Sequence, residues 1–150
     1  MIGQLAVSDV DTAAALSIRA DVSEVRRASE WLEKTCQERG VPEDETGRLD
    51  LCLNEALANA LTHGQAGGAP QPIRLRLAVS RENEVAEATV TVSDAGIAFD
   101  PLAAVPKLRP KTLAEAEPGG LGLFMIQSIT DKLSYRYDDG YNHLSFSVCW

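Results

Sequence analysis

The segment LCLNEALANALTHG, residues 51–64, decides how the rest of the chain is interpreted. Its apolar residues recur with helical spacing, which predicts an amphipathic helix that begins near Pro42 and ends with this segment. At about 100° per residue, Glu55, Asn59 and His63 lie along one ridge beside the apolar stripe. A carboxylate and a carboxamide in this position either belong to a solvated helix face or face a cavity between the helix and a sheet.

The spacing of apolar residues predicts further elements on both sides of this helix. Alternation of apolar and polar residues predicts strands, and a period of about 3.6 residues predicts helices. Asp21 and Glu24 resemble a capping box at the start of the first helix. We expect strands at 14–19, 73–79, 87–93, 133–137 and 144–148, and further helices at 22–39 and 121–129. This order predicts an α+β fold, a two-layer α/β sandwich with helices on one face of a mostly antiparallel sheet.

Length and charge restrict the chain to one acidic globular domain. It has 150 residues, and 14 Lys and Arg stand against 22 Asp and Glu, which gives a net charge of -8. This balance argues against binding to nucleic acid or to an anionic membrane surface, but a nucleotide phosphate needs only a few local donors. No apolar run approaches the roughly 20 residues of a membrane span, and no signal peptide is recognisable. Because the three cysteines form no CxxC pair, we expect reduced thiols in a cytoplasmic protein.

Two more polar clusters follow predicted elements. Asp94 and Gly96 end a predicted strand, where the carboxylate either initiates a turn or accepts a hydrogen bond from a ligand amine. Gly119, Gly120 and Gly122 precede a short apolar helix. Free amide groups at such a position favour an anion, although a flexible hinge has the same pattern. The irregular stretch between the two clusters is long for a compact domain, and such loops are often functional.

The order of the three clusters resembles that in the GHKL ATPases, which share the Bergerat ATP-binding fold. EALANALTHG (55–64), VSDAGIAFDP (92–101) and GGLGLFMIQSITDKL (119–133) are similar to the N, G1 and G2 boxes of the anti-sigma-factor serine kinases. The resemblance covers nearly the whole chain. It implies an N-terminal lead-in at 1–13 and a histidine kinase-like ATPase domain at 14–150 with an ATP lid at about 102–118.

The resemblance also implies a role for individual residues. Glu55 corresponds to the general base, Asn59 to the Mg²⁺ ligand, and Asp94 to the acceptor of the adenine amine. Ala98 occupies a position where the family commonly has a second glycine, and His63 receives no catalytic role. The remaining residues that we expect to bind ATP, either as matched glycines and their neighbours or as the apolar lining of the adenine pocket, are Gly96, Ile97, Phe99, Gly119, Gly120, Leu121 and Gly122.

Two of these assignments have alternatives. Ile97 and Phe99 either line the adenine pocket or pack in the core. The basic side chains of the expected lid either reach a phosphate or are solvated; they are Lys107, Arg109 and Lys111.

The function implied by the resemblance is that of an anti-sigma factor and ATP-dependent protein-serine kinase that uses Mg²⁺. Such a protein phosphorylates a serine on a STAS-domain anti-anti-sigma partner and switches its binding between that partner and a sigma factor. A homodimer is also implied. One alternative is a weak or inactive ATP-binding module that acts by sequestration only, which Ala98 favours and Glu55 opposes. Another is a detached histidine-kinase catalytic domain, which would require a partner that supplies the histidine.

Overall fold

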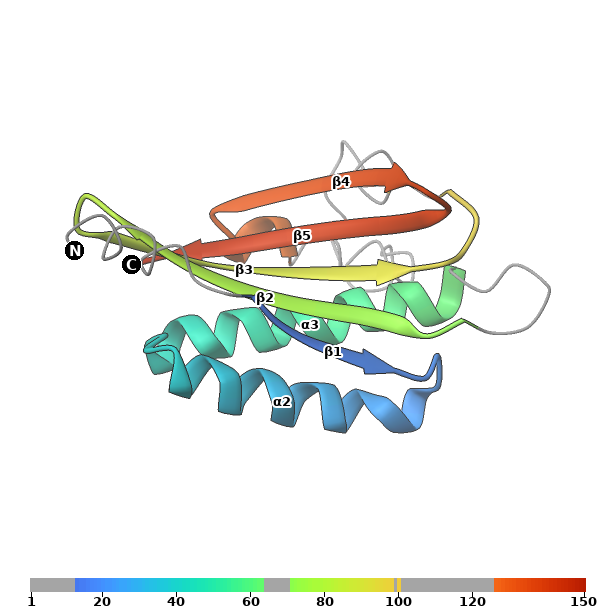
Figure 1. Cartoon of the computed structure of the whole chain (residues 1–150), viewed down its shortest axis with the longest axis horizontal. Helices are drawn as coiled ribbons and strands as arrows, with labels where there is room; N and C mark the ends of the chain where they lie inside the picture. The colour runs from blue at the N-terminus through green and yellow to red at the C-terminus, as the bar shows by residue number, and fades with distance from the viewer. Residues whose placement is uncertain (1–12, 64–70, 99, 101–125) are drawn as a thin grey trace, which may run out of the picture.

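The computed structural model describes residues 13–63, 71–98, 100 and 126–150. Within these residues every predicted element is present, and a short 3-10 helix, η1, precedes the first long helix (Figure 1). Residues 126–129 are the described end of the helix predicted at 121–129. The elements are β1 (Ala14–Ile18), η1 (Val22–Glu24), α2 (Val25–Glu38), α3 (Glu43–His63), β2 (Ile73–Glu82), β3 (Val85–Asp94), β4 (Lys132–Asp138) and β5 (Tyr141–Cys149).

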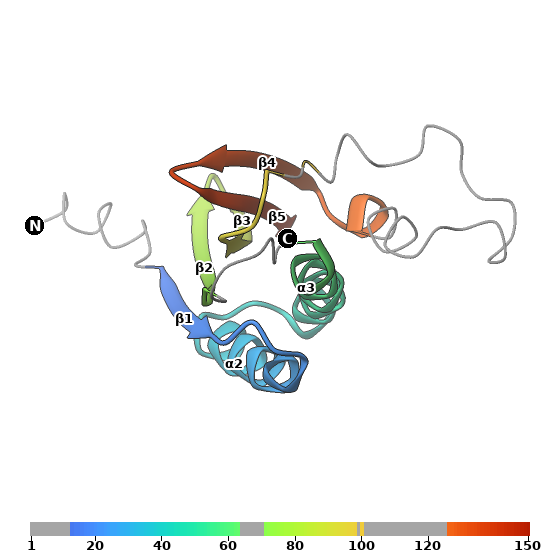
Figure 2. The same ribbon diagram turned by 90° about the vertical axis from the view of Figure 1, so that its right-hand side faces the viewer.

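The described strands form one five-stranded sheet in the order β1-β2-β3-β5-β4, and every neighbouring pair is antiparallel. Both long helices lie on the same side of the curved sheet (Figure 2). The α+β prediction with helices on one face is therefore confirmed. The opposite face of the sheet is not covered by a described helix.

Two tight turns accompany strands β2, β3, β4 and β5 that are longer than the sequence pattern predicts. Asn83 and Glu84 join β2 to β3 with positive φ values of 52° and 68°, and Asp139 and Gly140 join β4 to β5 with 55° and 81°. Two residues with positive φ are typical of hairpin turns whose twist matches that of the strands. The ladder between β2 and β3 therefore continues beyond Val79, where the predicted strand ends, up to the pair Glu82 and Val85.

The sequence predicts a capping box at Asp21 and Glu24. The Asp21 cap is present, but the capping role predicted for Glu24 is wrong. Asp21 caps η1, since its Oδ1 accepts from the Ser23 backbone N–H at 2.9 Å. Glu24 instead accepts from the Arg19 N–H at 3.0 Å and from the Arg27 guanidinium at 2.9 Å. The 3-10 turn between Asp21 and α2 directs the Glu24 carboxylate back toward the end of β1.

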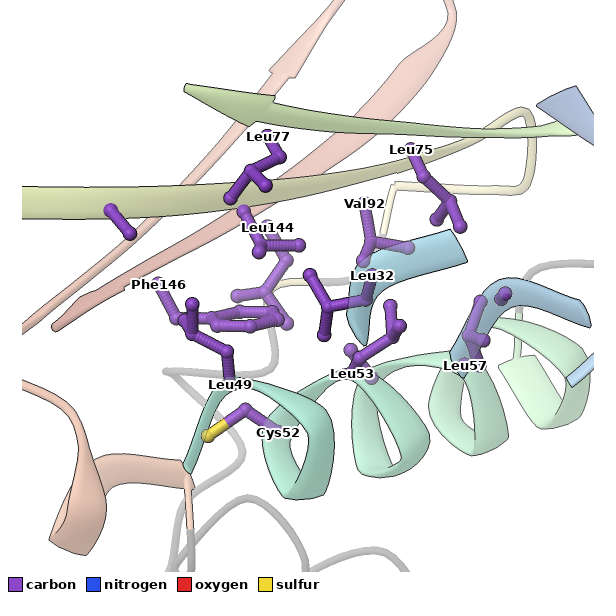
Figure 3. Close-up of a cluster of buried hydrophobic side chains, with 14 of the residues drawn as sticks. Leu32, Leu49, Cys52, Leu53, Leu57, Leu75, Leu77, Val92, Leu144 and Phe146 are labelled. Atoms are coloured by element: carbon purple, nitrogen blue, oxygen red, sulfur yellow. The ribbon is translucent and has the colours of Figure 1, made fainter. Parts of the chain in front are cut away.

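The hydrophobic core lies between the sheet and the two long helices. Leucines of α2 and α3 meet the inward side chains of β2, β3 and β5 (Figure 3). Cys36 and Cys52 belong to this core, where burial raises the pKa of their thiols to about 11 and about 12. Of the helices in the described ranges, none has both the length and the apolar character that crossing a membrane requires.

Candidate functional site

Helix α3 packs against β3 and β5 and carries the ridge that the sequence singles out. Leu53, Leu57 and their apolar neighbours are buried against the sheet, whereas Glu55 and Asn59 are only partly buried. The two polar side chains thus lie one turn apart at the rim of the helix–sheet interface, as the spacing predicts. His63 is the last residue of α3.

Asp94 is the last residue of β3, and its side chain is buried on the helix side of the sheet. Its Oδ1 accepts from the Gly96 backbone N–H at 3.1 Å and from Asn142 Nδ2 at 3.2 Å. Burial raises the pKa of this carboxyl group, and the hydrogen bonds from Asn142 and Gly96 partly oppose that rise. Within the described residues both of these hydrogen bonds are accepted by Oδ1, and none is accepted by Oδ2.

Asn142 is the site residue that the sequence patterns missed. It lies on β5 directly opposite Asp94, and Nδ2 also donates to the Ile97 carbonyl at 2.9 Å. The Tyr135 hydroxyl of β4 donates to Asn142 Oδ1. One buried carboxamide therefore connects the end of β3, the following turn and the β4–β5 hairpin. A signal was present, because Asn142 occupies an inward position of β5 where apolar residues are expected.

The turn after Asp94 presents its side chains to solvent. Gly96 is buried and its N–H closes the turn onto Asp94. Ile97 is 63% exposed, so the alternative of core packing is wrong for this residue. Asn142 Nδ2 donates a hydrogen bond to the Ile97 carbonyl, and the Ile97 side chain lies outside the core. Ala98 is also exposed, and Phe99 lies outside the described residues.

The expected G2 box lies outside the described residues, as does the lid at 102–118 with its three basic residues. The box comprises Gly119, Gly120, Leu121 and Gly122. Ile126, the first described residue after these segments, is fully buried in the core. Arg48 of α3 donates to the Ile129 carbonyl at 3.1 Å and pairs with Glu45 at 3.1 Å. These contacts hold residues 126–129 beside α3, as Figure 2 shows.

The donor set suits a magnesium ion that arrives with a nucleotide. Among the described residues there is no group of three or more His, Cys, Asp or Glu side chains that could hold a metal ion. Asn59 offers one hard carboxamide oxygen on the partly buried ridge. Because Mg²⁺ keeps several waters and shares ligands with substrate phosphates, one protein oxygen is sufficient when a triphosphate supplies the others.

Comparison with known sequences identifies relatives with named activities. The chain is 36% identical over 99 residues to the serine/threonine-protein kinase BtrW of Bordetella bronchiseptica, covering 66% of this chain and 67% of BtrW. It is 30% identical over 96 residues to the serine-protein kinase RsbW of Listeria monocytogenes, covering 61% of this chain and 59% of RsbW. The chain thus spans less than two thirds of RsbW.

Two solved structures share the fold. The structure of the RsbU and RsbW domains of Rv1364c from Mycobacterium tuberculosis matches with a TM-score of 0.65 and 14% identity, over 91% of this chain and 32% of that one. The SiaB–SiaC complex from Pseudomonas aeruginosa matches with a TM-score of 0.58 and 15% identity, over 100% of this chain and 96% of that one. At these identities the match concerns the fold alone.

The family model of the histidine kinase-like ATPase domain matches residues 18–148. This range includes α2, α3, β2, β3 and β4, only the last residue of β1, and all of β5 except Cys149. It also includes Glu55, Asn59, Asp94 and Asn142. The chain therefore belongs to the histidine kinase-like ATPase domain family.

Proposed function

We propose that the chain is an ATP-dependent protein-serine kinase that acts as an anti-sigma factor. Its substrate in this proposal is a serine of a STAS-domain anti-anti-sigma protein. The observation that carries the proposal is the placement of the buried Asp94 carboxylate and the Glu55–Asn59 ridge on the same side of the sheet, where α3 packs on β3. The named kinase activities of BtrW and RsbW support the reaction class.

Asp94 would select the base of the nucleotide. A buried carboxylate with one unused oxygen accepts a hydrogen bond from the exocyclic amine of adenine, whereas guanine presents a carbonyl oxygen at that place. The exposed Ile97 side chain offers an apolar contact beside it. ATP is therefore the nucleotide that this geometry favours over GTP.

Glu55 and Asn59 would act at the other end of the nucleotide. The serine hydroxyl oxygen attacks the γ-phosphorus, the bond from that phosphorus to the bridging oxygen breaks, and ADP leaves. Glu55 accepts the hydroxyl proton as the new phosphate ester forms. Asn59 would help to hold Mg²⁺, which neutralises charge on the phosphates.

Partner switching completes the proposal. Phosphorylation of the STAS-domain protein would release the kinase, which then occupies a sigma factor. A structure of the same fold was solved as a complex of SiaB with SiaC, which supports a protein partner. We include a cytoplasmic location and a homodimer in the proposal. Sequestration of a sigma factor is compatible with the net charge of -8, because a protein that binds the sigma factor need not contact DNA itself.

The test is phosphate transfer from radiolabelled Mg·ATP to each purified STAS-domain protein of the source genome. We expect acid-stable phosphoserine on one of them, and no transfer by Glu55→Gln, which should still bind ATP. ATP binding without transfer by the wild-type protein would support the sequestration module instead. Acid-labile phosphohistidine would support the detached histidine-kinase domain, and either result overturns the kinase proposal.

A further inference from the structure

The face of the sheet opposite the helices carries an ordered pattern of polar residues. Cross-strand register places these residues in two rows that run across β2, β3, β5 and β4. Residues in neighbouring strands of one row lie directly opposite each other on one face. One row is Arg76, Thr91, Ser145 and Ser134, and the other is Arg74, Ser93, His143 and Arg136.

The two rows form a trough, which we define by Arg74, Arg76 and Arg136 at its sides and the short side chains of β3 and β5 on its floor. Strand spacing of about 4.8 Å sets the backbones of Arg74 and Arg76 on β2 roughly 14 Å from that of Arg136 on β4. Because the middle strands carry only serine, threonine and histidine here, the arginines stand above the floor. A hollow of about 400 Å³ lies in this position.

The trough is held in place by its own contacts. Thr91 and Ser145 share a hydrogen bond of 2.8 Å, and Ser93 bonds His143 Nδ1 at 2.7 Å. Arg74 donates to the Tyr141 hydroxyl at 2.9 Å, and its guanidinium lies 4.5 Å from the centre of that ring. The floor and one wall are therefore ordered before any partner binds, which lowers the entropic cost of binding.

The charge of the trough is opposite to that of the chain. The whole chain carries -8, whereas three arginines line this hollow. On the same face, Glu87 is paired with Lys132 at 2.7 Å, and Asp138 lies at the exposed end of β4. The trough therefore has a local positive field on an acidic protein, which attracts negatively charged groups.

We propose that the trough binds an acidic segment of a partner protein in extended conformation, with carboxylates paired to Arg74, Arg76 and Arg136. Small-molecule pockets are mostly lined by apolar side chains, whereas most residues that line this hollow have polar side chains, among them three exposed arginines. Arginine and tyrosine are enriched at protein interfaces. Two copies facing each other would bring arginines against arginines, which disfavours that arrangement.

This surface is separate from the proposed kinase site. Asp94 and Glu55 belong to the helix side of the sheet, while Ser93 and His143 face the trough from neighbouring positions of β3 and β5. The inference therefore stands or falls independently of the phosphoryl transfer proposed above.

The probe is a fluorescein-labelled hexaglutamate peptide, with hexalysine as the opposite-charge control. We expect binding by fluorescence anisotropy that weakens as salt rises. Arg76→Glu should weaken it about tenfold, because a like charge replaces a pairing charge. The matched variant is Lys34→Glu, an exposed residue of α2 with the same change in charge, and it should stay within about twofold of wild type. Circular dichroism melting confirms that both variants fold.

Backbone NMR of the protein with hexaglutamate locates the binding. We expect the largest shift changes at the amides of Ser93, His143 and Ser145. Equal weakening by the two variants, or shift changes centred on α2 and α3, would overturn the proposal. So would binding of inorganic pyrophosphate in the trough without peptide binding, which indicates a small-anion site. Self-association that Arg76→Glu abolishes would indicate a second copy as the occupant and also overturn it.

Discussion

Replacement of Asn142 by alanine should affect both the stability of the domain and the ionisation of Asp94. The carboxamide is 6% exposed and bonds Asp94, the Ile97 carbonyl and the Tyr135 hydroxyl. Its removal deprives three buried or half-buried groups of a partner at once. No other described side chain connects β3, β4 and the turn after Asp94 in this way.

The expected loss is about 2–4 kcal/mol of unfolding free energy, because each hydrogen bond lost from a buried group costs about 1–3 kcal/mol and water recovers part of that. For a domain of this size, 3 kcal/mol corresponds to a fall in Tm of about 10 °C. Folded domains have only about 5–15 kcal/mol in total, so the variant should remain folded at 25 °C.

The unfolding free energy that Asn142→Ala loses relative to wild type should also depend on pH. Burial raises the Asp94 pKa, and the Asn142 hydrogen bond opposes that rise, so its loss raises the pKa further. A carboxyl with a raised folded-state pKa contributes stability that is present at low pH and lost as pH rises through that pKa. The difference between wild type and Asn142→Ala should therefore grow as the pH rises above about 4, the ordinary pKa of an aspartate.

The assay is urea unfolding followed by tryptophan fluorescence at several pH values. Ser145→Ala is the control, since Ser145 lies on the same strand but faces away from Asp94, and within the described residues its side chain bonds the Thr91 hydroxyl. Ser145→Ala should lose about 1 kcal/mol of unfolding free energy, and this loss should be the same at every pH. A deficit for Asn142→Ala no larger than this control, or one that does not change with pH, refutes the reasoning.

Three further outcomes follow from the packing of the domain. Gly40 has a φ of +77°, so Gly40→Ala should cost about 1 kcal/mol in urea unfolding, and a neutral result would contradict a strained position. Arg48→Met removes the hydrogen bond to the Ile129 carbonyl, so amide hydrogen exchange should accelerate in residues 126–129 and stay unchanged in β2. Equal acceleration in both segments would contradict a local contact. Buried Cys36 and Cys52 have pKa values of about 11 and about 12, so they should resist Ellman's reagent at pH 8 until urea unfolds the protein. Equal labelling rates with and without urea would contradict this prediction.

Periodicity explains why much of the fold could be predicted. The alternation from Ile73 to Val79 and the helical stripe through Leu53 and Leu57 each indicate a buried face without knowledge of the partner element. The ridge of Glu55 and Asn59 follows from the same helical period. These features depend on residues close in sequence, so a single segment contains the signal.

The parts that could not be predicted depend on pairing between distant strands. Asn142 becomes part of the site only because β5 places it opposite Asp94. Arg76 and Arg136 flank one trough only because β3 and β5 lie between β2 and β4. Neither register is encoded in one local segment. Glu24 failed as a capping partner for a similar reason, since its acceptor role is determined by the end of β1.

The central claim is that an adenine nucleotide binds on the helix side of the sheet and that its exocyclic amine donates a hydrogen bond to Asp94. Calorimetric titration of nucleotides tests this claim most directly. Wild-type protein with Mg²⁺ should bind ATP and not GTP. Asp94→Asn should weaken ATP binding about 10- to 100-fold, the loss expected when a hydrogen bond to a charged group is removed. The same variant should unfold at an equal or higher urea concentration, because the carboxamide can still accept from the Gly96 N–H and no buried charge remains. Equal binding of ATP and GTP, or unchanged ATP affinity in Asp94→Asn, would contradict the account.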